Sequence, residues 1–348
     1  MGRESRLINN MIGNSPINGD QRAYNVVLCA DPRFALGAWV VIWSAYESSG
    51  RNLAFSLLTT GAGSEPIRKM QNLAKRAGIG LEIVPVDTRL LEDLPTAGRH
   101  AFNVYIRLLA PGVLPHLDRF LYLDSDVLVR SSVLPLFAEL SSDKIALAIR
   151  DYGYSDIRHG LKRTYKELLL DAAAPYVNSG VMMINARLWR DEDITTQALN
   201  YLQKYRTTIL HPDQDALNAV LCNKLTEVDL GWNVQIGAIR SFDRTGWPED
   251  RASLRRRRAQ LLSEAKIVHF IGPSKPWEDG LLMPYVREYR KVIVGSGWIP
   301  KWRKGPWLAF WLFSASRKAL QRRFLKSDKA ESIGKRANRF SQHKAETL

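Results

Sequence analysis

Cysteine is nearly absent from this chain of 348 residues, which contains only Cys29 and Cys222. Two thiols cannot form the disulfide framework of a small secreted domain, so they favour a reducing compartment. The first 20 residues contain no apolar core of the kind that a secretory signal requires. Gly2 follows Met1, but Arg6 replaces the Ser or Thr of the myristoylation pattern. We therefore predict a cytoplasmic protein with neither a leader nor an N-terminal lipid.

Long hydrophobic runs are missing, and acidic residues are scarce near the C-terminus. The longest apolar stretch of the first half, residues 35–45, is too short to span a bilayer. Residues 301–348 contain 13 Lys or Arg against 3 Asp or Glu, a net charge of +10, whereas residues 1–300 contain 37 against 32, a net charge of +5. Such a basic segment indicates an anionic partner, either a nucleic acid or a membrane surface.

The remaining composition is typical of a globular protein, with 45% hydrophobic and 24% charged residues. Apolar runs alternate with helical patterns and predict strands at 24–30, 53–60, 81–86, 120–123, 144–150, 177–185 and 267–270, and helices at 35–48, 64–77, 102–109, 188–205 and 213–222. This alternation predicts an α/β fold with a doubly wound, mostly parallel mixed sheet. We expect a poorly ordered extension at 1–22, one domain at 23–300 and a basic, aromatic tail at 301–348.

A pair of carboxylates follows the most apolar short run of the chain. Residues 120–123 read as a buried strand, and this run ends on Asp124, Ser125 and Asp126. Side chains at i and i+2 of a strand point the same way, and open α/β sheets bind ligands at this edge. Neighbouring carboxylates repel each other, and a divalent cation such as Mg²⁺ or Mn²⁺ would neutralise them. An ordinary surface turn is the alternative, because Asp and Ser are common turn residues.

A second stretch with candidate chemistry lies at residues 267–277. An apolar run delivers His269, a tight turn follows at Gly272, and Lys275 is presented three residues later. Imidazole suits a borderline metal such as Mn²⁺, and Lys binds phosphate as a point charge. A buried structural His and a surface Lys are the alternative for this stretch alone. Together with the two Asp, the pattern indicates a metal and diphosphate site.

The order of several motifs resembles glycosyltransferase family 8. This family comprises retaining sugar-nucleotide enzymes, among them glycogenin and bacterial lipopolysaccharide galactosyl- and glucosyltransferases. The resemblance covers about residues 24–290, and it implies a GT-A fold and a UDP-hexose-dependent hexosyltransferase. The matching motifs, in chain order, are Ala30-Asp31, Tyr122-Leu123-Asp124-Ser125-Asp126, Asn178-Ser179-Gly180-Val181, Asp213-Gln214-Asp215 with Asn218, and residues 269–277.

The resemblance implies a role for each matching position. Asp124, Asp126 and His269 match the metal ligands, with Mn²⁺ the usual ion and Mg²⁺ the alternative. Gly272 and Lys275 match the residues that hold the diphosphate, beside Asp124. The positions that match the lining of the donor sugar are Arg107, Asp151, Asn178, Asp213 and Gln214.

The nucleoside end departs from the family pattern. Ala30 and Asp31 match the uracil and ribose contacts, but Pro32-Arg33 replaces the acidic and amide residues common there. Phe34 stands where the lipopolysaccharide enzymes often carry a Tyr that stacks on uracil, so stacking is kept and a hydroxyl is lost.

The chemistry that the resemblance implies leaves several interpretations open. Gln214 or Asp215 is expected near the reacting carbon, with either a covalent intermediate or front-face attack. A plain turn at Asn178 and its neighbours is the lesser alternative, and a helix cap after Pro212 is the alternative for Asp213. Arg107 and Asp151 could equally form a structural ion pair.

Two other classes of protein compete with this interpretation. Residues 120–127 also fit the haloacid-dehalogenase-like phosphatases, in which Asp124 would be the nucleophile. That motif opens its domain, however, whereas about 95 residues of α/β pattern precede it here, and residues 269–277 would have no role. A non-catalytic scaffold whose tail binds membrane or nucleic acid is the other alternative. The body shows no basic groove with interleaved aromatics, so we expect no nucleic-acid partner.

Tryptophan and phenylalanine accompany the basic residues of the tail. Residues 306–313 form a short aromatic run, too short to span a bilayer, beside the bases of residues 317–326. Aromatic and basic residues together suit the headgroup interface of an anionic membrane. We expect a peripheral enzyme on the inner membrane face with a lipid-linked saccharide acceptor. Packing of this run on the domain is the alternative.

The four-arginine run at residues 255–258 is a separate feature, and it is expected to form a solvated helix face.

Overall fold

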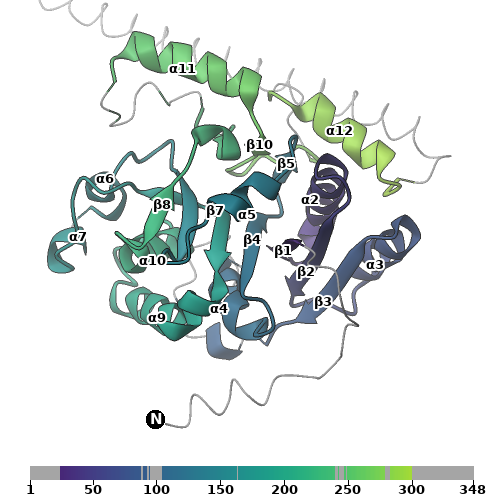
Figure 1. Cartoon of the computed structure of the whole chain (residues 1–348), viewed down its shortest axis with the longest axis horizontal. Helices are drawn as coiled ribbons and strands as arrows, with labels where there is room; N and C mark the ends of the chain where they lie inside the picture. Colours follow the sequence, from purple (N-terminus) through teal and green to yellow (C-terminus); the bar gives the residue numbers. More distant parts are fainter. Residues whose placement is uncertain are drawn as a thin grey trace, which may run out of the picture.

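A seven-stranded sheet forms the centre of the molecule (Figure 1). The computed structural model describes residues 24–299, except 88, 92–93, 95–103, 163, 240–241, 243–246, 248 and 279–282. The strands in spatial order are β3 (Gly80–Pro85), β2 (Leu53–Thr59), β1 (Tyr24–Cys29), β4 (Arg119–Asp124), β7 (Val177–Asn185), β6 (Ala146–Arg150) and β8 (Leu225–Glu227). Strands β3, β2, β1 and β4 are parallel, β7 is antiparallel to β4 and β6, and β8 is parallel to β6. The prediction of an α/β fold with a mostly parallel mixed sheet is confirmed.

Helices cover both faces of this sheet, and its central strands are therefore buried on both sides. In β4, Leu121 and Leu123 join one apolar cluster, whereas Phe120 and Tyr122 join the other. The first cluster packs under α2 (Ala35–Ser48), α3 (Glu65–Ala77) and α12 (Val286–Gly295). The second packs under α4 (Ile106–Val113), α8 (Ala186–Asp191), α9 (Ile194–Lys204) and α10 (Pro212–Leu221). This burial explains why β4 reads as a continuous apolar run.

A second, three-stranded sheet adjoins the end of β4. Its order is β5 (Val127–Val129), β10 (Ile267–His269) and β9 (Val234–Gln235). Strand β10 is antiparallel to β5 and parallel to β9, and the amide of Phe270 donates to the carbonyl of Asp126 at 3.0 Å. The strand predicted at 267–270 exists, but its place in the main sheet was wrong. The chain leaves β4 at Asp124, turns, and continues as β5, which provides the edge on which β10 pairs.

Two helix predictions were also wrong. Helix α4 continues through Pro111, because near the end of a short helix the missing proline N–H removes one hydrogen bond only; the predicted start at residue 102 lies outside the described residues. The helix predicted at 188–205 is two helices, because Asp193 adopts φ of 50°, in the left-handed region. The Trp189 indole donates to Thr195 Oγ at 3.0 Å across this break, which stabilises the bend.

The other elements are short, apart from one outer helix. They are η1 (Pro32–Phe34), η2 (Arg89–Leu91), α5 (Leu134–Glu139), α6 (Ile157–Leu161), α7 (Thr164–Glu167), η4 (Leu230–Asn233) and α11 (Arg251–Glu264). Helix α11 carries the arginine run, and Arg255 and Arg256 are exposed on it, as expected for a helix face. Within the described part of the chain, no helix has both the length and the apolar character that crossing a membrane demands. The extension at 1–22 and the tail at 301–348 lie outside the described residues.

Candidate active site

The polar residues of the site come from strand ends that meet at one edge of the sheet. Cys29 pairs with Asp124 in register, so Ala30 and Asp31 follow β1 directly beside the end of β4. Because β7 is antiparallel, its amino-terminal residues Asn178 and Gly180 reach the same edge. This is the edge at which open α/β sheets bind ligands.

Asp126 does not belong to strand β4, contrary to the expectation from strand alternation. The strand ends at Asp124, and Ser125 and Asp126 form the turn to β5. This turn lies on helix α2 at Gly37, where an added Cβ would come within 2.3 Å of the Ser125 carbonyl oxygen and 2.8 Å of the Trp277 ring. The two carboxylates therefore converge through a turn that packs closely against Gly37 of α2.

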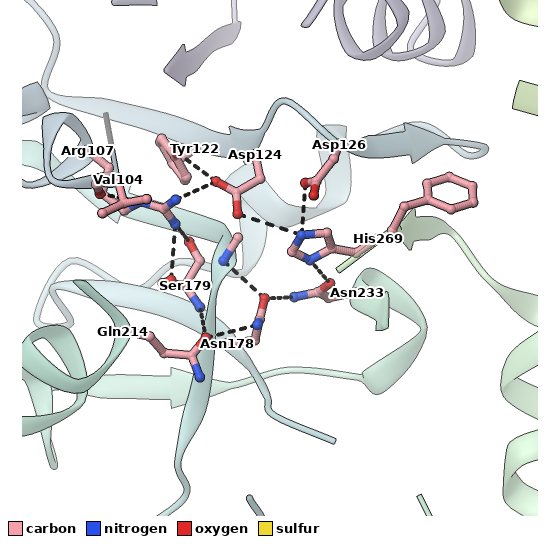
Figure 2. Close-up of polar contacts among 12 residues, drawn as sticks. Val104, Arg107, Tyr122, Asp124, Asp126, Asn178, Ser179, Gln214, Asn233 and His269 are labelled. Atoms are coloured by element: carbon pink, nitrogen blue, oxygen red, sulfur yellow. Dashed lines mark hydrogen bonds and ion pairs between the residues drawn. The ribbon is translucent and has the colours of Figure 1, made fainter. Parts of the chain in front are cut away.

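Asp124, Asp126 and His269 form a compact cluster of candidate metal ligands, with one ligand atom of each within 4.8 Å of the others. His269 Nε2 lies 3.0 Å from Asp126 Oδ1 and 3.6 Å from Asp124 Oδ2, as Figure 2 shows. His269 is buried, and the two carboxylates bring negative charge together in a partly dry site. Two carboxylate oxygens and an imidazole nitrogen fit a divalent cation such as Mn²⁺ or Mg²⁺. The structure thus brings together the three residues predicted as ligands.

Lys275 lies at the same cluster. Its ammonium is 2.5 Å from Asp126 Oδ2 and donates to the carbonyl of Phe270 at 3.0 Å. Burial raises the pKa of Asp126, but Lys275 and His269 outweigh it and hold that pKa below its ordinary value. Asp126 is therefore a carboxylate at neutral pH. Gly272, three residues before Lys275, has φ of 92°, a conformation that favours glycine.

Arg107 connects the carboxylates of two different elements. Its guanidinium pairs with Asp124 at 2.8 Å and with Asp213 at 3.1 Å, and it donates to the hydroxyl and carbonyl of Ser179, both at 3.0 Å. Burial lowers the pKa of Arg107, but the two carboxylates outweigh it and raise the pKa well above its ordinary value. The alternative of a structural ion pair between Arg107 and Asp151 was wrong, because Arg107 pairs with Asp124 and Asp213 instead.

Asp151, Asn178 and Gln214 form a buried cluster of hydrogen bonds. Asn178 Nδ2 donates to Gln214 Oε1 at 2.9 Å and to Asp151 Oδ2 at 3.3 Å. Gln214 Nε2 donates to the same Asp151 oxygen at 3.1 Å. Asp151 also accepts from the backbone amides of Gly153 and Tyr154. Asn178 lies in strand β7, so its interpretation as a plain turn was wrong.

Helix α10 separates the two acidic residues of its first turn. Asp213 faces the site and accepts from Ser179 Oγ at 3.1 Å, so it is not the helix cap that was considered. Asp215 points away, accepts from the Tyr176 hydroxyl and from the amides of Leu210 and His211, and has its pKa raised by burial. Of the two alternatives near the reacting carbon, these contacts favour Gln214, because they commit the Asp215 carboxylate to Tyr176 and the loop before α10.

The nucleoside end of the predicted site is built from residues that follow β1. Asp31 Oδ1 accepts from the amides of Arg33 and Phe34, and Asp31 Oδ2 pairs with the Arg33 guanidinium at 2.7 Å. The Phe34 ring packs edge-on against Trp277, with 5.7 Å between ring centroids. Arg33 is one of the residues that depart from the family pattern, and its positive charge partly neutralises the Asp31 carboxylate. Ala30, the residue before Asp31, is buried.

Tyr122, Gly180 and Asn233 also contribute to the site, although no role was predicted for them from the sequence. The Tyr122 hydroxyl donates to Asp124 Oδ1 at 2.8 Å. A Cβ on Gly180 would lie 2.2 Å from His269 Cε1 and 2.7 Å from Asp124 Oδ2, so this position has no room for a side chain. Asn233 contacts His269 Nδ1 at 3.0 Å. Tyr122 and Gly180 stand within recognised motifs, which could have drawn attention to them, whereas Asn233 follows no sequence pattern.

This chain is similar in sequence to curated proteins and similar in fold to solved structures. The curated relatives include general stress protein A of Bacillus subtilis, 25% identical over 281 residues, which cover 79% of this chain and 94% of that protein. Lipopolysaccharide 1,3-galactosyltransferase of Salmonella typhimurium is 27% identical over 287 residues, 81% of either chain. The galactosyltransferase LgtC, solved with donor and acceptor sugar analogues, shares the fold with a TM-score of 0.68 at 22% identity, covering 81% of this chain and 99% of that one.

The fold is therefore GT-A-like, as the resemblance implied. The sequence model of glycosyl transferase family 8 matches residues 25–280, which include all the polar residues described above. The phosphatase and scaffold alternatives are not favoured by these findings. The chain belongs to glycosyl transferase family 8, and the protein is a glycosyltransferase.

Proposed function

We propose that this glycosyltransferase moves a hexose, galactose or glucose, from a UDP-sugar to a saccharide acceptor, with retention at the anomeric carbon and with Mn²⁺ as its metal. The observation that carries the proposal is the cluster of Asp124, Asp126 and His269 beside the buried amides of Asn178 and Gln214. A metal and diphosphate site next to a hydrogen-bonding cradle is what transfer from a sugar nucleotide requires.

The charges of the site suit departure of a diphosphate. The anomeric carbon–oxygen bond to the diphosphate breaks and UDP leaves with the electron pair, while the acceptor hydroxyl bonds to the anomeric carbon and its proton passes to the departing diphosphate. Asp124, Asp126 and His269 would hold a divalent cation, which would supply Lewis acidity toward the diphosphate. Lys275 adds a second positive charge beside it, and the charge that it meets grows as the bond breaks.

The buried polar cluster fits recognition of the sugar. Arg107 and Asp213 present a paired guanidinium and carboxylate, while Asp151, Asn178 and Gln214 present fixed donors and acceptors. Preorganised groups of this kind hold sugar hydroxyls without reorganisation as the oxocarbenium-like state forms. Ala30, Asp31 and Phe34 are proposed to contact the nucleoside, and Gly272 the diphosphate.

Release of free UDP tests this function directly. The protein is incubated with UDP-galactose or UDP-glucose, with Mn²⁺ or with excess chelator, and UDP is quantified. We expect slow hydrolysis of one UDP-hexose that requires Mn²⁺ and little release of GDP from GDP-mannose. Equal release with chelator would overturn the metal-dependent mechanism, and preference for the guanosine nucleotide would overturn the donor assignment.

Lys275→Ala is expected to lower kcat more than it raises KM for the donor. Removing one preorganised group that stabilises developing charge costs about 10²- to 10³-fold in kcat. Lys266→Ala removes a half-exposed lysine that pairs with Asp229, and it should keep the wild-type kcat. Steady-state kinetics with the preferred UDP-hexose provide the measurement. Unchanged turnover with a raised KM would show that Lys275 only binds the ground state.

The acceptor is proposed to be lipid-linked, as in lipopolysaccharide, and the enzyme to act at the cytoplasmic face of the inner membrane. Support comes from the sequence of residues 301–348 and from a lipopolysaccharide galactosyltransferase among the relatives. A tail of this composition is attracted to anionic headgroups by about 1 kcal/mol for each Lys or Arg near the surface.

Deleting residues 301–348 is expected to abolish sedimentation with anionic vesicles while leaving Mn²⁺-dependent UDP release intact. The full chain should sediment at low salt and be released at high salt, because charge attraction is screened. Vesicles made of neutral lipid provide the control. Sedimentation of the truncated protein with anionic vesicles would contradict this role for the tail.

A further inference from the structure

Both nitrogens of the His269 ring have polar neighbours. Nε2 faces the carboxylates of Asp124 and Asp126, and Nδ1 lies 3.0 Å from Asn233 Oδ1 (Figure 2). Asn233 comes from η4 and is completely buried, and His269 is nearly so. Burial of an amide costs free energy unless both its oxygen and its NH₂ group have hydrogen-bond partners. The Asn233 side chain must therefore direct each of these two groups at a suitable partner.

The orientation of Asn233 follows from a hydrogen bond that begins at the backbone. The amide of Gly180 can only donate, and it lies 3.1 Å from Asn178 Oδ1. That contact identifies this Asn178 atom as oxygen, and it leaves Nδ2 to donate to Asp151 and Gln214. The side chain of Asn233 approaches the same Asn178 oxygen at 2.9 Å and must do so with its NH₂ group. Its own oxygen is thereby turned to His269.

An acceptor at Asn233 requires that Nδ1 of His269 carry a proton. The Nε2 lone pair of a neutral ring is then directed at Asp124 and Asp126, as a metal ligand requires. A histidine that binds a metal donates its other ring N–H to a neighbouring acceptor, and losing that acceptor weakens metal binding. In this protein the acceptor is an amide whose orientation depends on Asn178.

We propose that Asn233 is a positioning residue that selects the metal-binding tautomer of His269. Because Asn233 takes its orientation from Asn178, the hydrogen bonds also connect the cluster of Asp151 and Gln214 to the metal ligand. The inference rests on the proposed metal site. It assigns a role to a residue outside the recognised motifs and predicts that metal affinity depends on a side chain that does not touch the metal.

The test compares two substitutions at Asn233 by their affinity for Mn²⁺, measured without substrate by electron paramagnetic resonance of the free ion. Asn233→Leu removes the acceptor, and we expect Mn²⁺ affinity to fall by about 10- to 100-fold. Asn233→Asp keeps an oxygen facing Nδ1 but loses the NH₂ group that donates to Asn178, so its Mn²⁺ affinity is expected to fall clearly less than that of Asn233→Leu, since the acceptor is what the tautomer needs. A split between the two variants is the signature of positioning, because damage to packing alone would not distinguish them.

Asn185→Leu is the matched control. Asn185 is a buried asparagine at the end of β7 far from Asn178, where its oxygen accepts from the amide of Leu188 at the start of α8. This variant should lower Tm and keep the wild-type affinity for Mn²⁺. Thermal unfolding of all variants shows that each is folded at the temperature of the titration.

Each outcome has a distinct meaning. Wild-type affinity in a folded Asn233→Leu protein, or equal losses in Asn233→Leu and Asn233→Asp, would overturn the inference and leave the metal site standing. Absence of Mn²⁺ binding by the wild-type protein would instead overturn the metal-dependent function. If Asn233→Leu does not fold, Asn233→Ala, which is smaller and also lacks an acceptor, replaces it; reduced Mn²⁺ affinity supports the inference, and wild-type affinity overturns it.

Discussion

Asp126→Asn is expected to reduce transfer by at least about a hundred-fold. The carboxylate lies 3.0 Å from His269 Nε2 and forms an ion pair with Lys275, so it contacts both the imidazole and the ammonium. A neutral amide cannot offset a divalent cation as a carboxylate does, and the cation contributes several kcal/mol to stabilisation of the leaving group. Lys275 would also lose the partner of its buried charge, so a lower Tm is expected.

The measurement combines Mn²⁺ affinity, UDP release and thermal unfolding. Asp191→Asn makes the same chemical change at an exposed residue of α8 whose contact with Arg187 is long, 3.8 Å, and it should match the wild type in all three. Full activity of Asp126→Asn in excess chelator would rule out the metal-dependent mechanism. Loss of activity with unchanged Mn²⁺ affinity would instead show that Asp126 acts on Lys275 rather than on the metal.

Gly180→Ala is expected to lower activity by about a hundred-fold, because displacement of a catalytic group by about 1 Å has an effect of this size. The new methyl group would lie 2.2 Å from His269 Cε1, 2.9 Å from His269 Nδ1 and 2.7 Å from Asp124 Oδ2. None of these atoms can yield easily. His269 is held by Asn233 and Asp124 by Arg107 and Tyr122, so the methyl group must push at least one ligand out of place.

Gly80→Ala provides the matched control for this substitution. Gly80 lies in β3 of the same sheet, and an added Cβ would approach nothing closer than Ala54 Cβ at 3.9 Å. We expect Gly80→Ala to keep both activity and Mn²⁺ affinity, while Gly180→Ala loses both and is destabilised by about 1–3 kcal/mol through overpacking. A Gly180→Ala protein with wild-type Mn²⁺ affinity would show that the ligands tolerate the displacement.

Much of the central sheet could be predicted because its signals are local. The apolar run before Asp124 and the alternation of strands with helices follow from burial, which acts residue by residue along the chain. The positions at which helices are interrupted or end were harder to predict. Asp193 adopts a left-handed conformation that interrupts a continuous helical pattern, and the Trp189 contact with Thr195 that stabilises it forms only after folding. The position of Pro111 inside α4 could not be predicted either, because the free-energy cost of a proline in a helix depends on where the helix begins and ends.

The candidate site shows the same division. Residue type and order alone indicated the chemistry of Asp124, Asp126 and His269, because carboxylates at a strand end and an imidazole near a Gly-x-x-Lys turn have few other uses together. Which partner each polar residue takes could not be predicted. Arg107 pairs with Asp124 and Asp213 and not with Asp151, and no periodicity in the sequence relates these positions to one another.

The sequence by itself determined the family, the α/β class and the types of group in the site, since these depend on local composition and on the order of motifs. Only the tertiary structure decided how those groups are oriented. It paired Asp215 with Tyr176, placed β10 in a second sheet and brought Asn233 to His269. The physical reason is that hydrogen bonds in a buried site are assigned jointly by strands and helices that meet only when the chain packs, so each orientation belongs to the assembled network.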